Sequence, residues 1–318
     1  MAAKLSIIIP HRGNGLGLWA TIHSCESNLM RSGLDYNFVV VTNGEKKLPQ
    51  DTYATVEQLK KTGRLLSHIH SEEPITPPVA RQRGASAADG ELLFFFDNHC
   101  LLEKQYFERA VMDYEKHGYG LLHSATVFHT GDGVHYHYRL TLDNNFWASS
   151  IKYLDNEYLP YQCAAGGHGG IVVPKKVWDD VGGYGPESLF KGYGGEELIF
   201  DLKLWMYGYK VMLDPRLIHY HYAGTRGYSR HFTDDYYVNL MVSAHVIGGE
   251  KWLYKVFHSF CDPTKSHLRL SGSSQRPWYD LLIEAYERSA QYAHEVAVRR
   301  DKDLDTLLAW FRANLIPY

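Results

Sequence analysis

The stretch ELLFFFDNHC, residues 91–100, decides the fold that we expect for this chain. The apolar run from Leu92 to Phe96 predicts a buried strand, and Asp97 and His99 follow where that strand should end. In open α/β sheets, ligands bind outside the carboxyl ends of the strands. Side chains two apart on an extended segment point the same way, so both could bind one divalent cation, and such mixed oxygen and nitrogen ligation suits Mn²⁺ better than Ca²⁺. Equally, Asp97 could cap the next helix and His99 could be a loop residue.

Around this stretch, short β-branched or aromatic runs alternate with amphipathic segments through the first two thirds of the chain. The alternation predicts an α/β fold with a mostly parallel central sheet and helical crossovers. From about His231 the pattern changes to long helices, so we expect a domain over residues 1–230 and a C-terminal helical region over 231–318, interrupted by a polar loop at 271–277. The expected strands are Leu5–Ile9, Phe38–Val41, Leu65–Ile69, Leu92–Phe96, Gly120–Phe128, Gly170–Val173 and Lys210–Leu213, and the expected helices include Leu18–Met30, Tyr236–Ile247, Lys251–Phe260, Trp278–Val298 and Leu304–Leu315.

Composition argues against several classes of function. Thirty-three basic and 36 acidic side chains give a formal net charge of -3, which supplies no overall basic surface for nucleic acid or anionic membranes. The four cysteines are widely spaced and form no C-x-x-C pair, so neither a zinc knuckle nor a disulfide scaffold is expected. The N-terminal MAAKLSIIIP lacks the apolar length of a signal peptide, and no later run is long enough to span a bilayer. We therefore expect a soluble, cytoplasmic protein.

A second motif is acidic. The glycine-rich GYGGEEL, residues 192–198, delivers Glu196 and Glu197 to the start of an expected helix. Acidic residues in a first helical turn commonly complement the helix dipole, so capping is the simplest interpretation. The apolar face of this helix and its end at Gly208 fix the orientation of the two carboxylates. One of them could then act as a general base toward a substrate hydroxyl.

A third motif is HYH, residues 219–221, just after the strand expected to end at Leu213 and after Pro215. Alternation places His219 and His221 on the same side of an extended segment. Two such histidines could bind metal, although exposed pairs without a partner carboxylate usually do not.

Together these motifs resemble the GT-A glycosyltransferases, family 2-like enzymes with a Rossmann-like sheet. The closest likeness is to the catalytic domain of polypeptide N-acetylgalactosaminyltransferases, which carry a D-x-H motif after an apolar strand, an arginine-rich segment before it and a G-G-E loop after it. The likeness covers roughly residues 4–231 and implies sugar transfer from a nucleotide diphosphate donor. The matching segments are Ala80-Arg81-Gln82-Arg83-Gly84-Ala85, Asp97-Asn98-His99-Cys100, Gly169-Gly170-Ile171-Val172, Val177-Trp178 and Gly194-Gly195-Glu196, continued through Trp205, Gly208 and Pro215 to His221.

The resemblance implies a metal site. Asp97, His99 and His221 would hold Mn²⁺, or Mg²⁺, on the donor diphosphate. His219 is then a structural imidazole beside the site. Next to the donor the same motifs place Asn98, Gly169 and Gly170.

The resemblance also implies a nucleotide edge. The base should border the ends of the first two strands, at Pro10, Arg12, Thr42 and Asn43. Relatives usually have an acidic pair that reads uracil at the end of the second strand, and Thr42-Asn43-Gly44 replaces it here. Either Thr42 or Asn43 could still hydrogen-bond a pyrimidine, so a UDP-sugar is the expected donor.

Three arginines are candidate contacts of the donor. Arg81 and Arg83 are implied at the diphosphate or uridine, because guanidinium pairs bidentately with such oxygens, and a solvated helix face is the alternative. The flexible composition of residues 223–231 predicts a lid in which Arg226 contacts diphosphate in the closed state. An ordinary polar connection is the alternative there.

The residue after the G-G-E glutamate bears on stereochemistry. The retaining N-acetylgalactosaminyltransferases have Asn there, whereas inverting β-1,4-galactosyltransferases and many family 2 enzymes have Asp as catalytic base. Glu197 occupies this place. A carboxylate can deprotonate an attacking hydroxyl and an amide cannot, so we expect inversion with Glu197, or its neighbour Glu196, as base.

The sequence leaves the acceptor open. A saccharide or glycan is commonest for this architecture, and a protein hydroxyl or a hydroxymethylated base in phage-type DNA are the alternatives. DNA would require base flipping and a basic groove, to which Lys251, Lys255, Arg269 and Arg276 could contribute. A non-catalytic GT-A-fold binding module ranks low because metal triad and acidic loop are intact. A nucleotidyltransferase is disfavoured because its G-x-G-T-R-type loop is absent.

Overall fold

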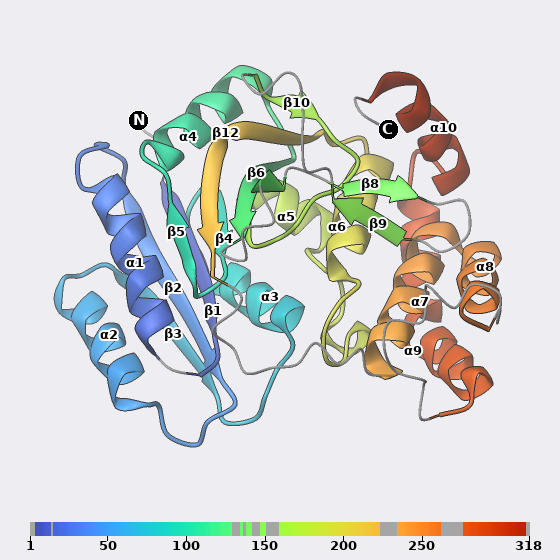
Figure 1. Ribbon diagram of the computed structural model, residues 1–318, viewed down its shortest axis with the longest axis horizontal. Helices are drawn as coiled ribbons and strands as arrows, with labels where there is room; N and C mark the ends of the chain where they lie inside the picture. The colour runs from blue at the N-terminus through green and yellow to red at the C-terminus, as the bar shows by residue number, and fades with distance from the viewer. Residues whose placement is uncertain are drawn as a thin grey trace.

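The computed structural model describes residues 4–13, 15–128, 134–135, 138–141, 147–150, 159–222, 234–261 and 276–315. Its centre is a ten-stranded sheet in the order β10-β12-β6-β11-β4-β1-β2-β3, with β5 paired to β12 and β7 to β6 (Figure 1). A two-stranded ribbon of β8 (Tyr138–Thr141) and β9 (Trp147–Ser150) accompanies it. The strands of the main sheet are β1 (Leu5–His11), β2 (Tyr36–Asn43), β3 (Leu65–Ser71), β4 (Leu92–Phe96), β5 (Cys100–Leu102), β6 (Leu121–Phe128), β7 (Val134–His135), β10 (Tyr161–Gln162), β11 (Gly170–Pro174) and β12 (Val211–His221).

The expected α/β sheet is confirmed, with one reversal that matters for the site. β1 is parallel to β2 and β4, β2 is parallel to β3, and β12 is parallel to β6. β11 instead runs antiparallel to both β4 and β6. Gly170, at the start of β11, therefore lies opposite Phe96, at the end of β4. This reversal brings a glycine pair to the edge where the buried run ends.

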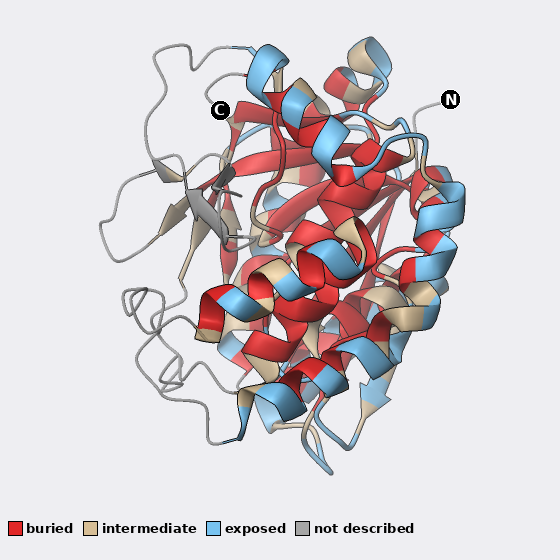
Figure 2. Ribbon diagram, turned by 90° about the vertical axis from the view of Figure 1, so that its right-hand side faces the viewer, coloured by how far each residue is buried: buried red, intermediate tan, exposed pale blue. Residues whose placement is uncertain are grey.

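Helices cover both faces of the sheet because its strands are apolar on both sides. Ile7 and Ile9 of β1 face a core shared with α1, α2 and α4, whereas Ile8 faces a core shared with α3, α5 and α6. In Figure 2 the strands and the inner helix faces are buried, and exposed residues lie on the outer helix faces. These helices are α1 (Gly15–Leu29), α2 (Gln50–Lys61), α3 (Pro77–Ala87), α4 (Tyr106–His117), α5 (Lys175–Val181), the short 3-10 turn η1 (Glu187–Leu189) and α6 (Glu196–Met206).

Among the described residues after 233, four further helices gather beside α6, on the opposite side of the molecule from α1 and α2 (Figure 1). Their buried side chains belong to the same core as α3, α5 and α6. No helix in the described part of the chain is both long and apolar enough to cross a membrane. These helices are α7 (Asp234–Gly248), α8 (Glu250–Cys261), α9 (Trp278–Arg299) and α10 (Leu304–Asn314).

Two local expectations are wrong. The HYH motif does not follow a strand but lies within β12, which continues past Pro215 because a register shift between Asp214 and Ile218 accommodates the proline. Residues 97–99 form a turn rather than an extended segment. Trp19 of α1 is 53% exposed and stacks on His23.

The contact between α3 and β1 supplies a test of the packing. A Cβ atom on Gly84 would lie 2.4 Å from Cγ2 of Ile8. We expect Gly84→Val to lower the free energy of unfolding by about 1–3 kcal/mol, since extra methyl groups overpack a filled core. Ser86→Val places the same β-branched side chain on an exposed position of α3 and is the matched control. Equal stability of both variants in urea unfolding would contradict the packing described.

Candidate active site

Three side chains meet at the edge of the sheet where β4 ends. Nε2 of His221 lies 3.1 Å from Oδ2 of Asp97 and 3.1 Å from Nε2 of His99. Strand pairing produces the meeting, because β5 runs antiparallel to the end of β12 and sets His221 opposite Cys100. The backbone N–H of Tyr222 also donates to the carbonyl of His99 at 3.1 Å. The cluster forms through a turn and a cross-strand pair, without the extended geometry expected for Asp97 and His99.

The spacing of these atoms fits a divalent cation. Two ligand atoms bonded at about 2.1 Å and at right angles lie roughly 3 Å apart, which matches both distances around Nε2 of His221. One carboxylate and two imidazoles form the mixed donor set that suits Mn²⁺ and related ions. The three side chains are each partly exposed, so oxygens of a bound diphosphate can approach.

Arg81 bonds to one oxygen of the Asp97 carboxylate and leaves the other oxygen to His221. Its Nη2 donates to Oδ1 of Asp97 at 2.9 Å and to the carbonyl of His168 at 3.0 Å, and its side chain is only 4% exposed. Oδ2 is left to face His221. Burial opposes ionisation of Asp97, but Arg81, His221 and His99 outweigh it and hold its pKa well below the usual range. The carboxylate is therefore charged and oriented at neutral pH.

Asn98 links His99 to the interior. Its Nδ2 lies 2.5 Å from Nδ1 of His11, and its Oδ1 lies 2.9 Å from Nδ1 of His99. Nε2 of His11 in turn lies 3.0 Å from Oγ1 of Thr52. The carbonyl oxygen of an amide only accepts, so Nδ1 of His99 carries the proton in this arrangement. The lone pair of His99 then sits on Nε2, the nitrogen that faces His221 and Asp97.

His219 is a structural neighbour of the cluster, as the resemblance implied. It is fully buried, with Nδ1 2.8 Å from Oγ of Ser124 and Nε2 3.2 Å from Oγ1 of Thr126. Burial and the adjacent His221 lower its pKa to about 3, so the ring is neutral. A Cβ atom on Gly170 would lie 2.7 Å from Nδ1 of this ring, which explains a glycine there by packing.

Gly169 also packs close to the cluster. A Cβ atom on it would lie 3.2 Å from Nε2 of His219 and 3.2 Å from Cδ2 of His221. Its carbonyl accepts from the backbone N–H of Asp97 at 3.2 Å. The glycine pair thus borders the metal residues, and direct contact with the donor stays a prediction.

The acidic pair lies at the start of α6 and its two members differ. Glu196 is 3% exposed, and its Oε2 has no hydrogen-bond partner among the described residues. Burial and the neighbouring Glu197 raise the pKa of Glu196 to about 7, although Arg81 pulls it down. Glu197 is partly exposed, and its Oε1 accepts the backbone N–H of His168 at 3.0 Å. Glu197 is therefore the member of the pair that solvent and substrate can reach.

Sequence reasoning missed a buried cluster behind this pair. Asp201 of α6 is fully buried, with Oδ1 2.8 Å from Nε2 of His168 and Oδ2 2.9 Å from Nε2 of His123. Burial raises the pKa of Asp201, but His123 and His168 lower it by more, so that the pKa falls to about 2. The backbone of His168 then reaches Glu197 and Arg81, so the cluster ties the acidic pair to the metal residues. The sequence signal that could have revealed this cluster is an aspartate inside the apolar run of α6.

The ends of β1 and β2, where nucleotide binding is expected, lie side by side in the sheet. Pro10 pairs with Val41, and the side chain of Arg12 lies over Gly44. Oγ1 of Thr42 lies 2.9 Å from Nε2 of His68 and 2.9 Å from Nδ1 of His70. The two histidines of β3 are residues that sequence reasoning did not single out.

Asn43 and Arg83 already have partners in the protein. The Asn43 amide donates to the carbonyl of His11 at 3.3 Å and accepts from the N–H of Ile75 at 3.2 Å. Arg83 pairs bidentately with Glu187 of η1 at 2.7 and 2.8 Å. A direct contact of either with the donor stays a prediction.

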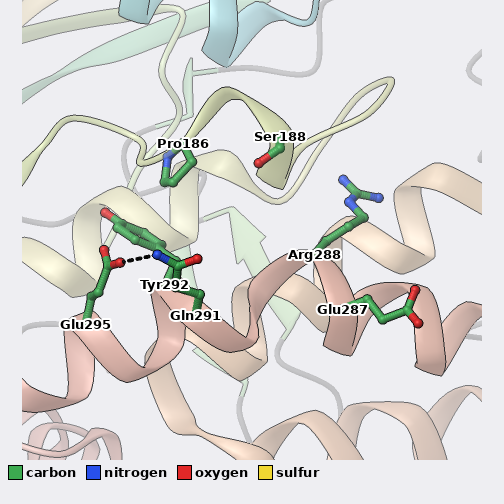
Figure 3. A pocket seen from close by; sticks show the side chains of 7 residues that line it. All are labelled: Pro186, Ser188, Glu287, Arg288, Gln291, Tyr292 and Glu295. Atoms are coloured by element: carbon green, nitrogen blue, oxygen red, sulfur yellow. Dashed lines mark hydrogen bonds between the residues drawn. The ribbon is translucent and has the colours of Figure 1, made fainter.

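Arg226 and the rest of the expected lid, residues 223–231, lie outside the described residues, which end at Tyr222 before this segment. A pocket of about 540 Å³ lies between η1 and α9 (Figure 3). Its lining residues are Pro186, Ser188, Glu287, Arg288, Gln291, Tyr292 and Glu295. This lining contains none of the residues expected to bind donor or metal.

The raised pKa of Glu196 predicts a pH dependence of stability. A carboxyl whose pKa is higher in the folded state contributes stability below about pH 4.5 and loses it as pH rises through 7. Glu196→Gln removes this loss, so relative to the unchanged protein it should gain on the order of 2–3 kcal/mol between pH 5 and pH 8. Urea unfolding in EDTA measures the gain, with Glu115→Gln on the exposed side of α4 as control. A gain that does not change with pH would refute the assignment.

Comparison with known proteins agrees with this geometry. The chain is similar in structure to GalNAc-T7, solved with UDP, GalNAc and Mn²⁺, at a TM-score of 0.65 and 17% identity. The match covers 93% of this chain and 57% of that chain, so this protein spans little more than half of its length, and at such identity the likeness shows the GT-A fold alone. No curated protein is similar to the chain by sequence. The family model "Glycosyl transferase family 2" matches residues 6–182, more than half of the chain, and this protein therefore belongs to glycosyl transferase family 2.

Proposed function

We propose that this family 2 glycosyltransferase moves a sugar from a UDP-sugar to a hydroxyl of a saccharide or glycan. Asp97, His99 and His221 would hold Mn²⁺ or Mg²⁺ against the donor diphosphate. The observation that carries the proposal is the convergence of these three side chains, 3.1 Å apart around Nε2 of His221, at the carboxyl edge of the sheet. The neutral ring of His219 and the Arg81 contact support the same assignment.

The cation would supply a positive charge that neutralises the diphosphate as it leaves. Neighbouring side chains orient the residues that would bind the cation. Arg81 and Asn98 orient Asp97 and His99, so their ligand atoms need little rearrangement when metal binds. The GT-A neighbour GalNAc-T7 was solved with UDP and Mn²⁺, which favours these two partners here.

Glu197 is the base that the geometry favours. The acceptor hydroxyl would give its proton to Glu197 while its oxygen bonds to the anomeric carbon and the bond from that carbon to the diphosphate breaks. Glu197 is partly exposed and is held by the N–H of His168, whereas Glu196 is buried with a pKa of about 7. Direct displacement inverts the anomeric carbon, so we propose an inverting reaction.

Charges on the helical region favour a saccharide over DNA. Lys251 pairs with Asp305 at 2.5 Å, and Arg276 pairs with Glu284 at 2.6 Å. Because each of these two cations faces a carboxylate, Lys251 and Arg276 contribute little to a basic groove. Arg269 lies outside the described residues.

The metal assignment predicts a binding defect. We expect His221→Ala to weaken Mn²⁺ binding in the presence of UDP by at least about tenfold, because one of three protein ligands is lost. Electron paramagnetic resonance of free Mn²⁺ measures the affinity directly. His258→Ala, at an exposed position of α8, is the control and should bind as the unchanged protein does. Unaltered affinity in His221→Ala, or turnover that is the same in EDTA, would remove the metal site.

The assignment of the base predicts a division between the two glutamates. Glu197→Gln should lower kcat by about 10²–10⁴, the usual contribution of a general base, with Mn²⁺ and UDP binding retained. Glu196→Gln should lower kcat less. Turnover that survives in Glu197→Gln and is abolished in Glu196→Gln would show that the roles are reversed.

The proposed function as a whole is tested by a hydrolysis screen. Nucleotide sugars with different bases and sugars are incubated with and without Mn²⁺, and the released nucleotide is measured. We expect metal-dependent release from a UDP-sugar, followed by transfer to saccharide acceptors. Transfer only to hydroxymethylated DNA or only to protein would contradict the saccharide acceptor. Release only from a donor other than a UDP-sugar would contradict the assignment of UDP.

A further inference from the structure

Asn239, a side chain of the C-terminal helices, bonds to the loop before the acidic pair at two residues. Asn239 of α7 is fully buried, and its Nδ2 donates to the carbonyls of Lys191 at 2.7 Å and Tyr193 at 3.3 Å. Its Oδ1 accepts the N–H of Lys191 at 3.3 Å and Nη2 of Arg288 at 2.9 Å. One amide therefore fixes two residues of the loop and is itself fixed from α9.

The rest of the loop lies flush against α7. Ser243, one turn beyond Asn239, donates to the carbonyl of Gly195 at 2.8 Å. A Cβ atom on Gly195 would lie 2.8 Å from the carbonyl oxygen of Asn239, and one on Gly194 would lie 2.5 Å from the ring of Tyr236. The close approach leaves no room for side chains at either position.

The backbone of this loop needs external support. Gly192, Gly194 and Gly195 all have positive φ, at +63°, +99° and +88°. Glycine reaches such angles without strain but loses much conformational freedom when it is fixed there. Gly195 is the N-cap of α6, and Glu196 and Glu197 are the first two residues of the helix. The bonds from α7 therefore help to place the two carboxylates.

Arg288 braces Asn239 from α9. Its Nη2 also donates to the carbonyl of Leu189, and its Nη1 lies 3.5 Å from Glu284. Figure 3 shows Arg288 on α9 beside the pocket, across from Ser188 of η1. The brace joins η1, α7 and α9 around the loop.

We propose that Asn239 is a positioning residue for sugar transfer, which holds the 191–195 loop so that Glu197 meets the acceptor hydroxyl. The inference rests on the proposed function of Glu197. By this account the helices after residue 233 complete the active site. The division of the chain at residue 230, which stays a prediction, would then separate two parts of one catalytic unit.

The test compares Asn239→Asp with Ser289→Ala. Asn239→Asp keeps the size and the acceptor oxygen but loses both donations to the loop carbonyls. We expect kcat for transfer to fall on the order of 10–100-fold, since small displacements of reacting groups cost that much. The affinity for Mn²⁺ with UDP should stay within about twofold, because the cluster of Asp97, His99 and His221 is untouched.

Ser289→Ala is the matched control because it breaks another buried bond between α7 and α9, the 2.8 Å contact of Ser289 with His245. It should lower thermal stability without lowering kcat. Equal kcat losses in the two variants, or an unchanged kcat in Asn239→Asp, would overturn the proposal. If Asn239→Asp does not fold, Ser243→Ala keeps the Asn239 amide but removes the hydroxyl that contacts the carbonyls of Gly195 and Asn239, and it should give a smaller kcat loss of the same kind.

Hydrogen exchange separates this inference from the proposed function. Amides of residues 191–197 should exchange faster in Asn239→Asp than in Ser289→Ala, whatever reaction the enzyme performs. Faster exchange with unchanged kcat would mean that the loop is held but Glu197 is not the base. Unchanged exchange would mean that Asn239 does not hold the loop.

Discussion

The site depends on the antiparallel pairing of β5 with the end of β12. That pairing places His221 opposite Cys100 and so beside the turn that carries Asp97 and His99. It is possible only because β12, which has 11 residues in all, passes Pro215 through a register shift and continues to His221. Without the continuation, the two halves of the cluster would end at different levels of the sheet. Gly169 and Gly170, at the start of the reversed strand β11, pack against this cluster, since a Cβ atom on either would lie close to His219 or His221.

The acidic pair is placed from two sides. From the sheet, Asp201 holds His123 and His168, and the backbone of His168 reaches both Glu197 and Arg81. From the C-terminal helices, the α7 face packs on the loop before Glu196. A glycine-rich loop would otherwise sample many conformations, which would be incompatible with the proton transfer proposed for Glu197. The core that α6 shares with α7 to α10 thus has a consequence for chemistry as well as for stability.

Much of the fold followed from local patterns, and the errors have physical causes. The run Leu92 to Phe96 predicted a buried strand and the edge of the site because apolar continuity is a local property. The strand expected to end at Leu213 continues past Pro215, because a bulge removes the need for the N–H donor that proline lacks. Asp97, His99 and His221 were found through motif spacing. The roles of Asp201 and Asn239 were not predicted because their hydrogen-bond partners are distant in sequence. The role of a buried polar residue can be assigned only when the groups around it are known.

The central claim is that one carboxylate and two imidazoles share a single cation. A crystal structure of the protein with UDP and Mn²⁺, with anomalous data collected at the manganese edge, tests it most directly. The account predicts one strong anomalous peak bonded to Asp97, His99 and His221. A peak held by other residues, or a His221 ring turned away from Asp97, would contradict it.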